Sequence, residues 1–266
     1  MKTKRKAPFV LTASDHGPMI VNRLDYRLVE SGGGYGVGYQ LLEASSFDPE
    51  EVDLLVGLLR LRRQYFGDGV FAIDCGANIG VHTIEWAKEM TGWGGVLAFE
   101  AQERIYYALA GNVALNNCFN ARAVLAAVAA ENGTLRVPRP NYQQPGSFGS
   151  LELRQAAANE FIGQQIDYSD AAMVEVRTIA LDSLGVPRVD LIKIDVEGME
   201  AEVLAGARGI LTSQHPVLLV EWIKASKEAI AAILVPLGYT VFEIALNLLA
   251  VHNDDRCLAH IKQRQA

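Results

Sequence analysis

The chain of 266 residues has few cysteines, no excess of basic residues and no long apolar run. Its three cysteines, Cys75, Cys118 and Cys257, are odd in number and lack a short metal-binding spacing, so we expect reduced thiols in a cytoplasmic protein. A formal net charge of −7 disfavours a nucleic-acid-binding protein, because such domains usually carry a basic excess. No apolar run approaches the ~18 residues that a transmembrane segment needs.

The glycine pattern G-x-G-x-x-G, which marks a dinucleotide-binding turn, is also missing from the first strand–helix turn. Residues 70–80 read Val-Phe-Ala-Ile-Asp-Cys-Gly-Ala-Asn-Ile-Gly and predict a buried strand that ends in an acid and enters a glycine turn. A helix pattern begins directly afterwards, at Val81. This order is typical of a site for a nucleotide-like ligand at the carboxyl end of a parallel strand.

Strand and helix patterns alternate along most of the chain after residue 69. Short apolar segments predict strands at 70–74, 96–100, 122–128, 190–194 and 217–221, and helix patterns lie at 79–90, 103–116, 198–211 and 226–236. This alternation predicts an α/β fold with a doubly wound parallel sheet. Two further strand-like runs, Tyr239–Ile244 and Leu248–His252, are joined by three residues, and a connection that short permits only an antiparallel pair.

Two regions fall outside this alternation. Residues 1–69 are expected to form an N-terminal extension or cap, which includes a helix that begins at Pro49 with Glu51 in a capping box. The segment at about 138–174 is rich in proline, glycine and polar residues, and an irregular stretch of that length is usually functional or an added subdomain. We expect it to be a substrate lid inserted into a ligand-binding domain of residues 70–266.

The residue types in the first strand–helix turn can each be explained by backbone conformation or by ligand chemistry. Gly76 lets the backbone leave the strand sharply and approach a ligand, Asn78 suits a left-handed conformation, and Gly80 allows the helix to pack closely. Asp74, at the strand tip, can receive an ammonium group. Glu100, at the tip of the next strand, is placed to accept hydrogen bonds from both hydroxyls of a ribose. A nicotinamide cofactor would use a similar acid, so an NAD-linked oxidoreductase stays open at this point.

Several motifs together resemble the FkbM family of S-adenosylmethionine-dependent methyltransferases. They are Asp-Cys-Gly-Ala-Asn-Ile-Gly (74–80), Phe99-Glu100, Asn112 and Asn116, Lys-Ile-Asp-Val-Glu-Gly-Met-Glu (193–200) and Pro-Val-Leu-Leu-Val-Glu (216–221). The resemblance covers roughly residues 70–244, with Ala101 where the family commonly has proline. It implies a class I methyltransferase fold, Rossmann-like and mostly parallel with a C-terminal antiparallel hairpin. It also implies S-adenosylmethionine as cofactor and methyl transfer, most often to an oxygen of a small molecule.

The expected cofactor-binding residues are Asp74, Gly76, Ala77, Asn78, Gly80, Glu100, Ala101, Asn116 and Asp195. The candidates for catalysis are Asp195, Glu197, Glu221 and His82. Asp195 and Glu221 follow strands that flank the ligand edge of the sheet, where a base beside an acceptor hydroxyl adds about 10²- to 10⁴-fold in rate. Glu197 fits equally well as a first-turn acid on a helix dipole, and His82 fits as a packing residue.

Two acids on adjacent strand tips also resemble the Mg²⁺ site of catechol-type methyltransferases, but no third ligand is evident from the spacing, so we expect no metal. The lid residues Tyr142, Ser147, Phe148 and Ser150, with Asn247 in the last hairpin, combine aromatic rings, hydroxyls and an amide. That mixture suits a hydroxylated acceptor such as a sugar, a polyketide or a lipid head group. A methyltransferase-like protein that binds ligand without catalysis is the non-enzymatic alternative.

Overall fold

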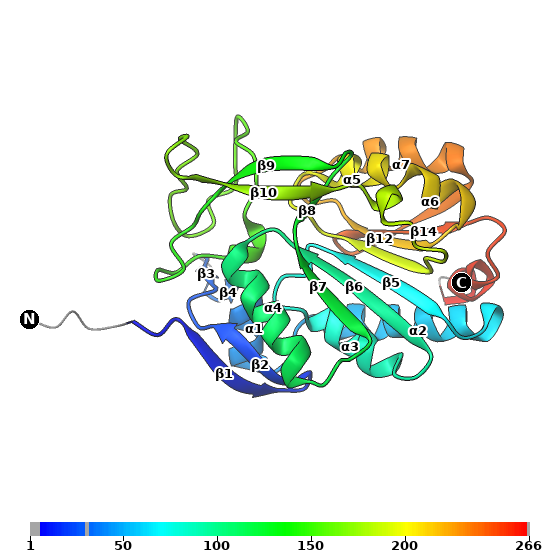
Figure 1. Cartoon of the computed structure of the whole chain (residues 1–266), viewed down its shortest axis with the longest axis horizontal. Helices are drawn as coiled ribbons and strands as arrows, with labels where there is room; N and C mark the ends of the chain where they lie inside the picture. Colours follow the sequence, from blue (N-terminus) through cyan, green and yellow to red (C-terminus); the bar gives the residue numbers. More distant parts are fainter. Residues whose placement is uncertain (1–5, 30–31, 265–266) are drawn as a thin grey trace, which may run out of the picture.

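The computed structural model describes residues 6–29 and 32–264 and is built around a seven-stranded sheet between two layers of helices (Figure 1). In spatial order the strands are β13 (Tyr239–Ile244), β14 (Asn247–His252), β12 (Val217–Glu221), β11 (Leu191–Ile194), β5 (Val70–Cys75), β6 (Gly94–Glu100) and β7 (Ala121–Leu125). Within this sheet, β14 runs opposite to the other six strands, and the remaining neighbouring pairs are parallel. The predicted sheet, mostly parallel and closed by a C-terminal antiparallel hairpin, is confirmed.

The direction in which successive strands are added to the sheet reverses between β5 and β11. Strands β6 and β7 follow on one side of β5, and β11 and β12 lie on its other side. Ligands of such sheets bind outside the carboxyl ends of the strands at this reversal. The strand predicted at 122–128 is divided in the structure. Its last part, β8 (Ala127–Val128), leaves the central sheet and pairs with β10 (Met173–Ile179) instead.

Helices cover both faces of the sheet because its central strands are apolar on both sides. On one face lie α2 (Pro49–Phe66), α3 (Val81–Glu89) and α4 (Glu103–Leu115); on the other lie α5 (Glu200–Gly206), α6 (Arg208–Ser213) and α7 (Lys227–Leu234); α8 (Cys257–Arg264) follows the last strand. Successive residues of β5 show this division, since Ala72 belongs to the first core and Ile73 to the second, and both are fully buried. Among the helices of the described residues, none is long and apolar enough to cross a bilayer.

The N-terminal region contributes a layer of its own and also part of the main core. Two antiparallel pairs, β1 (Phe9–Ser14) with β2 (Gly17–Asn22) and β3 (Arg27–Leu28) with β4 (Gly34–Tyr35), precede α1 (Val37–Ala44). Helix α2 buries Leu55 and Leu59 in the same core as Val70 of β5. The predicted boundary at residue 69 therefore falls inside one hydrophobic core, to which Met19 of β2 and Leu41 of α1 also belong.

Helix α2 begins at Pro49, as predicted, but its expected capping box is absent. Asp48, at the N-cap position, has a left-handed backbone with φ 38° and its side chain caps no backbone N–H group. Glu51 accepts a hydrogen bond from Asn247 Nδ2 at 2.7 Å instead. Glu51 therefore bonds to a residue of the last hairpin of the central sheet and not to the backbone at the N-terminus of its own helix.

The predicted lid is an excursion between two paired strands, β9 (Gly133–Pro138) and β10 (Met173–Ile179). Their antiparallel register pairs Pro138 with Met173, so the segment is closed at its base almost where the sequence placed its ends. With β8, these strands form a separate three-stranded sheet, and the lid loops project beyond it (Figure 1).

Candidate functional site

A cavity of about 280 Å³ opens at the carboxyl ends of the central strands. Its volume is close to the lower end of the range of about 300–1,000 Å³ that is usual for small-molecule sites. The lining includes the strand-tip acids Asp74, Glu100, Asp195 and Glu221, the turn residues 76–82, the lid residues Ser147, Gly149, Ser150 and Leu151, and the N-terminal residues Tyr35, Gly36, Val37, Phe47 and Asp48. We call the side at Asp74 and Glu100 the donor half and the side at Asp195 and Glu221 the acceptor half.

The donor half is organised by the turn after β5. Asn78 has a φ of 50°, so the predicted left-handed conformation is confirmed. Its backbone N–H donates to Glu100 Oε2 at 3.0 Å, and the N–H of Gln102 donates to Glu100 Oε1 at 2.7 Å. Burial raises the pKa of Glu100 to about 7. Two backbone donors thus fix this carboxylate in the cavity wall, and its remaining lone pairs can accept further hydrogen bonds.

The glycines of the turn are required by contacts within the protein. Gly76 has a φ of 79°, and a Cβ there would lie 1.7 Å from the carbonyl oxygen of Asp195. Gly80 has a φ of 92°, and a Cβ there would lie 2.5 Å from Leu109 Cδ1 of α4. Close packing of the two strand-end loops thus requires a glycine at position 76, and Gly76 also lines the cavity, as a residue that lets a ligand approach would. Ala77, between these glycines, lines the cavity and donates its backbone N–H to Phe99.

Asp74 is the polar group of the donor half that lacks a full set of partners. It is completely buried, and its Oδ2 accepts a hydrogen bond from the Thr83 hydroxyl at 2.6 Å. Its Oδ1 is buried and has no hydrogen-bond partner among the residues that the structure describes. A buried carboxylate oxygen in that state is unfavourable unless a donor reaches it, so the side chain fits the ammonium group of a ligand. Ala101 lines the cavity beyond Glu100 and adds only an apolar surface.

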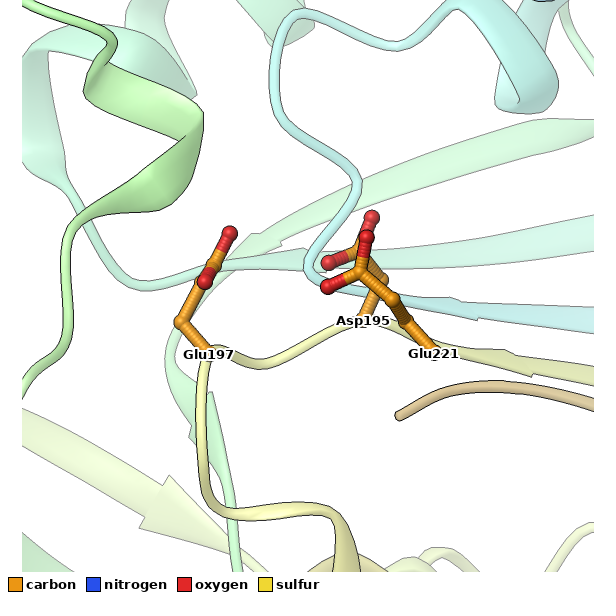
Figure 2. A group of neighbouring side chains, drawn as sticks. All are labelled: Asp195, Glu197 and Glu221. Carbon is orange, nitrogen blue, oxygen red and sulfur yellow. The ribbon is translucent and has the colours of Figure 1, made fainter. Parts of the chain in front are cut away.

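Three carboxylates meet in the acceptor half (Figure 2). Asp195 follows β11, Glu221 ends β12, and carboxylate oxygens of these two and of Glu197 lie within 4.8 Å of one another. Glu197 joins them because its backbone is left-handed, with φ 58°, which is unusual for a residue with a side chain. We call Asp195, Glu197 and Glu221 the acid cluster.

Two lysines neutralise part of the acid cluster. Lys193 Nζ lies 2.8 Å from Asp195 Oδ2, and Lys224 Nζ lies 2.6 Å from Glu197 Oε2. In the described part of the chain, no lysine or arginine forms an ion pair with Glu221. Burial and the charge of Asp195 raise the pKa of Glu197 to about 8 and that of Glu221 to about 9. Glu221, which has no lysine partner among the described residues, therefore retains its proton at neutral pH.

Three carboxylates so close together can hold a divalent cation, and the absence of a third ligand no longer argues against one. The sequence did not reveal Glu197 as that ligand because its position depends on one unusual backbone angle. Asp195 and Glu197 are, however, already paired with lysines, with which a cation would have to compete. We retain a site without metal as our proposal.

His82 lines the cavity from the first turn of α3 and is 5% exposed. Its Nε2 lies 3.1 Å from Glu51 Oε1, off the line of a good hydrogen bond. Sequence reasoning missed Glu51 here, since nothing local links α2 to the acceptor half. Asn247 was expected to touch substrate, but its side chain donates to Glu51 behind the cavity wall and the residue does not line the cavity.

Only part of the predicted lid set reaches the cavity. Ser147 and Ser150 line it, and their hydroxyl oxygens lie 3.0 Å apart. Phe148 is fully buried and Tyr142 packs against it with ring centroids 4.9 Å apart, while the Tyr142 hydroxyl donates to Gln102. These two aromatic residues anchor the lid in the hydrophobic core and do not line the cavity.

Asn116 was expected in the cofactor site, but the structure does not place it in the lining of the cavity. The residue caps the C-terminus of α4, and its side chain donates to the carbonyl of Pro18 at 2.9 Å, in the β1–β2 hairpin. A helix of 13 residues is about 20 Å long, so α4 carries Asn116 away from the carboxyl edge of the sheet.

Comparison with known proteins places this arrangement among methyltransferases. A family model described as the methyltransferase FkbM domain matches residues 74–254. Methyltransferase 1 of Beauveria bassiana (strain ARSEF 2860) is 29% identical over 151 residues, which cover 53% of this chain and 59% of that protein. Methyltransferase sdnD of Sordaria araneosa is 28% identical over 159 residues, 51% of this chain and 60% of that protein. The chain thus matches about three fifths of the length of these relatives.

Among solved structures, that of methyltransferase FkbM from Methylobacillus flagellatus KT is 16% identical. The match covers 72% of this chain and 48% of that chain, with a TM-score of 0.48.

Proposed function

The chain belongs to the FkbM methyltransferase family, and we propose that it transfers a methyl group from S-adenosylmethionine to a hydroxyl oxygen of a small molecule. The observation that carries the proposal is one cavity in which the donor half and the acid cluster share the same space. A ligand held at the strand tips Asp74 and Glu100 would extend toward Asp195 and Glu221.

The donor half has groups that match the polar ends of S-adenosylmethionine. The unpartnered Asp74 Oδ1 suits the ammonium of the methionine portion, and Glu100 suits the two ribose hydroxyls. When bound, this cofactor supplies a methyl group on a positively charged sulfur for in-line displacement. Holding donor and acceptor in line is worth on the order of 7–11 kcal/mol of the barrier, so positioning is the main task of the cavity.

The acceptor half suits removal of a proton from a hydroxyl group. A carboxylate pressed against the sulfonium would stabilise the ground state more than the transition state, so the acid cluster serves the reaction better at the acceptor. Asp195, which pairs with Lys193, is our candidate base, with Glu221 and Glu197 as neighbouring acids. His82, backed by Glu51, is the other candidate in the same wall.

The lid hydroxyls of Ser147 and Ser150 favour a polar, hydroxylated acceptor, and a sugar, a polyketide and a lipid head group all fit that description. The three cysteines are buried and unpaired, which is in keeping with our proposal of a cytoplasmic protein.

A transfer screen with S-adenosylmethionine labelled in its methyl group tests the proposal. We expect label in an ether-type product with at least one acceptor among sugars, polyketides and lipid head groups, and none when the acceptor hydroxyl is blocked. Tight binding of the cofactor without transfer to any acceptor would favour the non-catalytic binding protein instead. Label on nitrogen would contradict transfer to oxygen while leaving the methyltransferase activity intact.

A further inference from the structure

One buried lysine connects the acid cluster to the lid. Lys224 lies in the turn after β12, and its side chain is only 10% exposed. Its ammonium lies 2.6 Å from Glu197 Oε2 in the acid cluster. The same nitrogen donates to the backbone carbonyl of Ser150 at 2.5 Å and lies 3.2 Å from Glu160 Oε2, and both of these residues belong to the lid.

Glu160 extends this connection to the N-terminal layer. The hydroxyl of Tyr35 donates to Glu160 Oε1 at 2.5 Å, and Arg27 Nη1 donates to the same oxygen at 3.2 Å. The Arg27 guanidinium also lies 5.5 Å from the ring centroid of Phe161, the next lid residue. The carboxylate of Glu160 is thus shared by the N-terminal layer on one side and Lys224 on the other.

The part of the lid that Lys224 holds covers the cofactor turn. Ser147, Ser150 and Leu151 line the cavity, and the Gly149 backbone lies so close to Asn78 that a Cβ on Gly149 would be 2.8 Å from Asn78 Nδ2. Displacement of this wall separates Lys224 from Ser150 and Glu160. A buried charge that loses two of its three partners is less stable, so movement of the lid is coupled to the surroundings of the lysine.

We propose that Lys224 is a positioning residue whose single ammonium group holds Glu197 in the acid cluster and holds the lid over the donor half. The state of the lid and the arrangement of the acceptor-side acids are thereby coupled. The inference rests on the proposed function, because it assigns the covered turn to the cofactor.

Lys227 offers a matched control for Lys224. It lies three residues after Lys224, at the start of α7, and pairs with Glu243. Its Nζ lies 3.7 Å from the ring centroid of Trp222, and none of these contacts involves the lid or the acid cluster. Replacement of either lysine by methionine removes one charge and keeps most of the side-chain volume.

The first measurement is the dissociation rate of S-adenosylmethionine from the full chain. We expect Lys224→Met to increase that rate at least about tenfold and Lys227→Met to leave it within about twofold. Glu160→Gln, which releases only the lid side, should also accelerate dissociation, and Lys224→Arg should restore most of the slow rate. Equal rates in the two methionine variants would overturn the proposal.

Hydrogen exchange of residues 141–161 in the ligand-free protein gives a second, independent readout. We expect Glu197→Gln, a change in the acid cluster, to accelerate exchange in the lid, and Lys227→Met to leave it unchanged. No change in the lid with Glu197→Gln would show that the lysine contacts are separate and would contradict the coupling. If wild-type protein binds no S-adenosylmethionine, the proposed function fails, whereas the exchange experiment still decides the role of Lys224.

Discussion

The donor half of the cavity comes from one short stretch of chain and one neighbouring strand tip, whereas the acceptor half is assembled from distant segments. Residues 74–80 and Glu100 lie on adjacent parallel strands and are joined by backbone hydrogen bonds. The acid cluster comes from the loop between β11 and α5 and from the end of β12, and Lys224 and the lid complete it. A local motif is sufficient to position the residues of the donor half, but positioning the residues of the acceptor half requires the tertiary fold.

The two halves also differ in how well their charges are satisfied. Glu100 is held by two backbone donors, although burial still raises its pKa. The three acids of the acceptor half crowd one another, and one of them has a left-handed backbone. Crowded like charges and strained backbone lower the stability of the fold. They are typical of functional sites, where they are retained because function requires that arrangement.

The largest expected effect is on turnover, in the acceptor half. Asp195→Asn should reduce kcat by about 10²- to 10⁴-fold, because the variant cannot accept a proton from the acceptor hydroxyl. The dissociation constant of S-adenosylmethionine should stay within about threefold of wild type, since the donor half is unchanged. Steady-state kinetics and calorimetry on the same preparation measure both quantities. Asp254→Asn, whose side chain is 89% exposed, serves as the control, and wild-type turnover in Asp195→Asn would refute the assignment.

The second prediction concerns the donor half, where a substitution should weaken cofactor binding more than it lowers turnover. Glu100→Ala should weaken binding of S-adenosylmethionine at least about tenfold, which is about 1.4 kcal/mol, by removing the acceptor for the ribose hydroxyls. Turnover at saturating cofactor should change much less. Glu103→Ala, at the exposed start of α4, is the matched control in a calorimetric titration. Equal affinity of the Glu100 variant and wild type would show that the cofactor lies elsewhere.

A smaller effect is expected on stability, and it depends on pH. The pKa of Glu221 rises from 4.5 in the unfolded chain to about 9 in the fold, so the folded state binds more protons between these values and loses stability as the pH rises. Glu221→Gln removes that loss and should raise Tm by about 2–4 °C at about pH 9, for a gain of about 1 kcal/mol. At about pH 5 the gain should nearly vanish.

Thermal unfolding followed by circular dichroism measures this difference. Glu175→Gln, on an exposed part of β10, is the control for loss of a carboxylate. A Glu221→Gln variant that is less stable than wild type at high pH would mean that the carboxylate is stabilised in the fold and not crowded.

The smallest expected effect is that of metal removal. Because lysines already pair with Asp195 and Glu197, EDTA should change turnover by less than about twofold. Activity lost in EDTA and recovered with Mg²⁺ would instead make the acid cluster a metal site, with Glu197 as its third ligand.

The donor half could be predicted from sequence because its conformation depends on residues a few positions apart. The left-handed Asn78 and the strand-tip acids Asp74 and Glu100 follow from local turn chemistry and from the order of parallel strands. The lid could be delimited for a similar reason, since a break in the strand–helix alternation marks both of its ends.

The rest depends on contacts between distant residues, which no local pattern reports. Glu51 was expected to cap α2 but contacts Asn247, 196 positions away. Lys224 had no motif around it, although it contacts both the lid and the acid cluster. For Asn116 a motif was present but did not report its position. The family motif suggested a place in the cavity, but the length of α4 places the side chain beside Pro18.

Calorimetric titration of the wild-type chain with S-adenosylmethionine, and separately with NAD, tests most directly whether the donor half is a methyl-donor site. We predict one binding event per chain with S-adenosylmethionine and no binding heat with NAD. Binding of NAD without binding of S-adenosylmethionine would contradict the account and restore the oxidoreductase alternative.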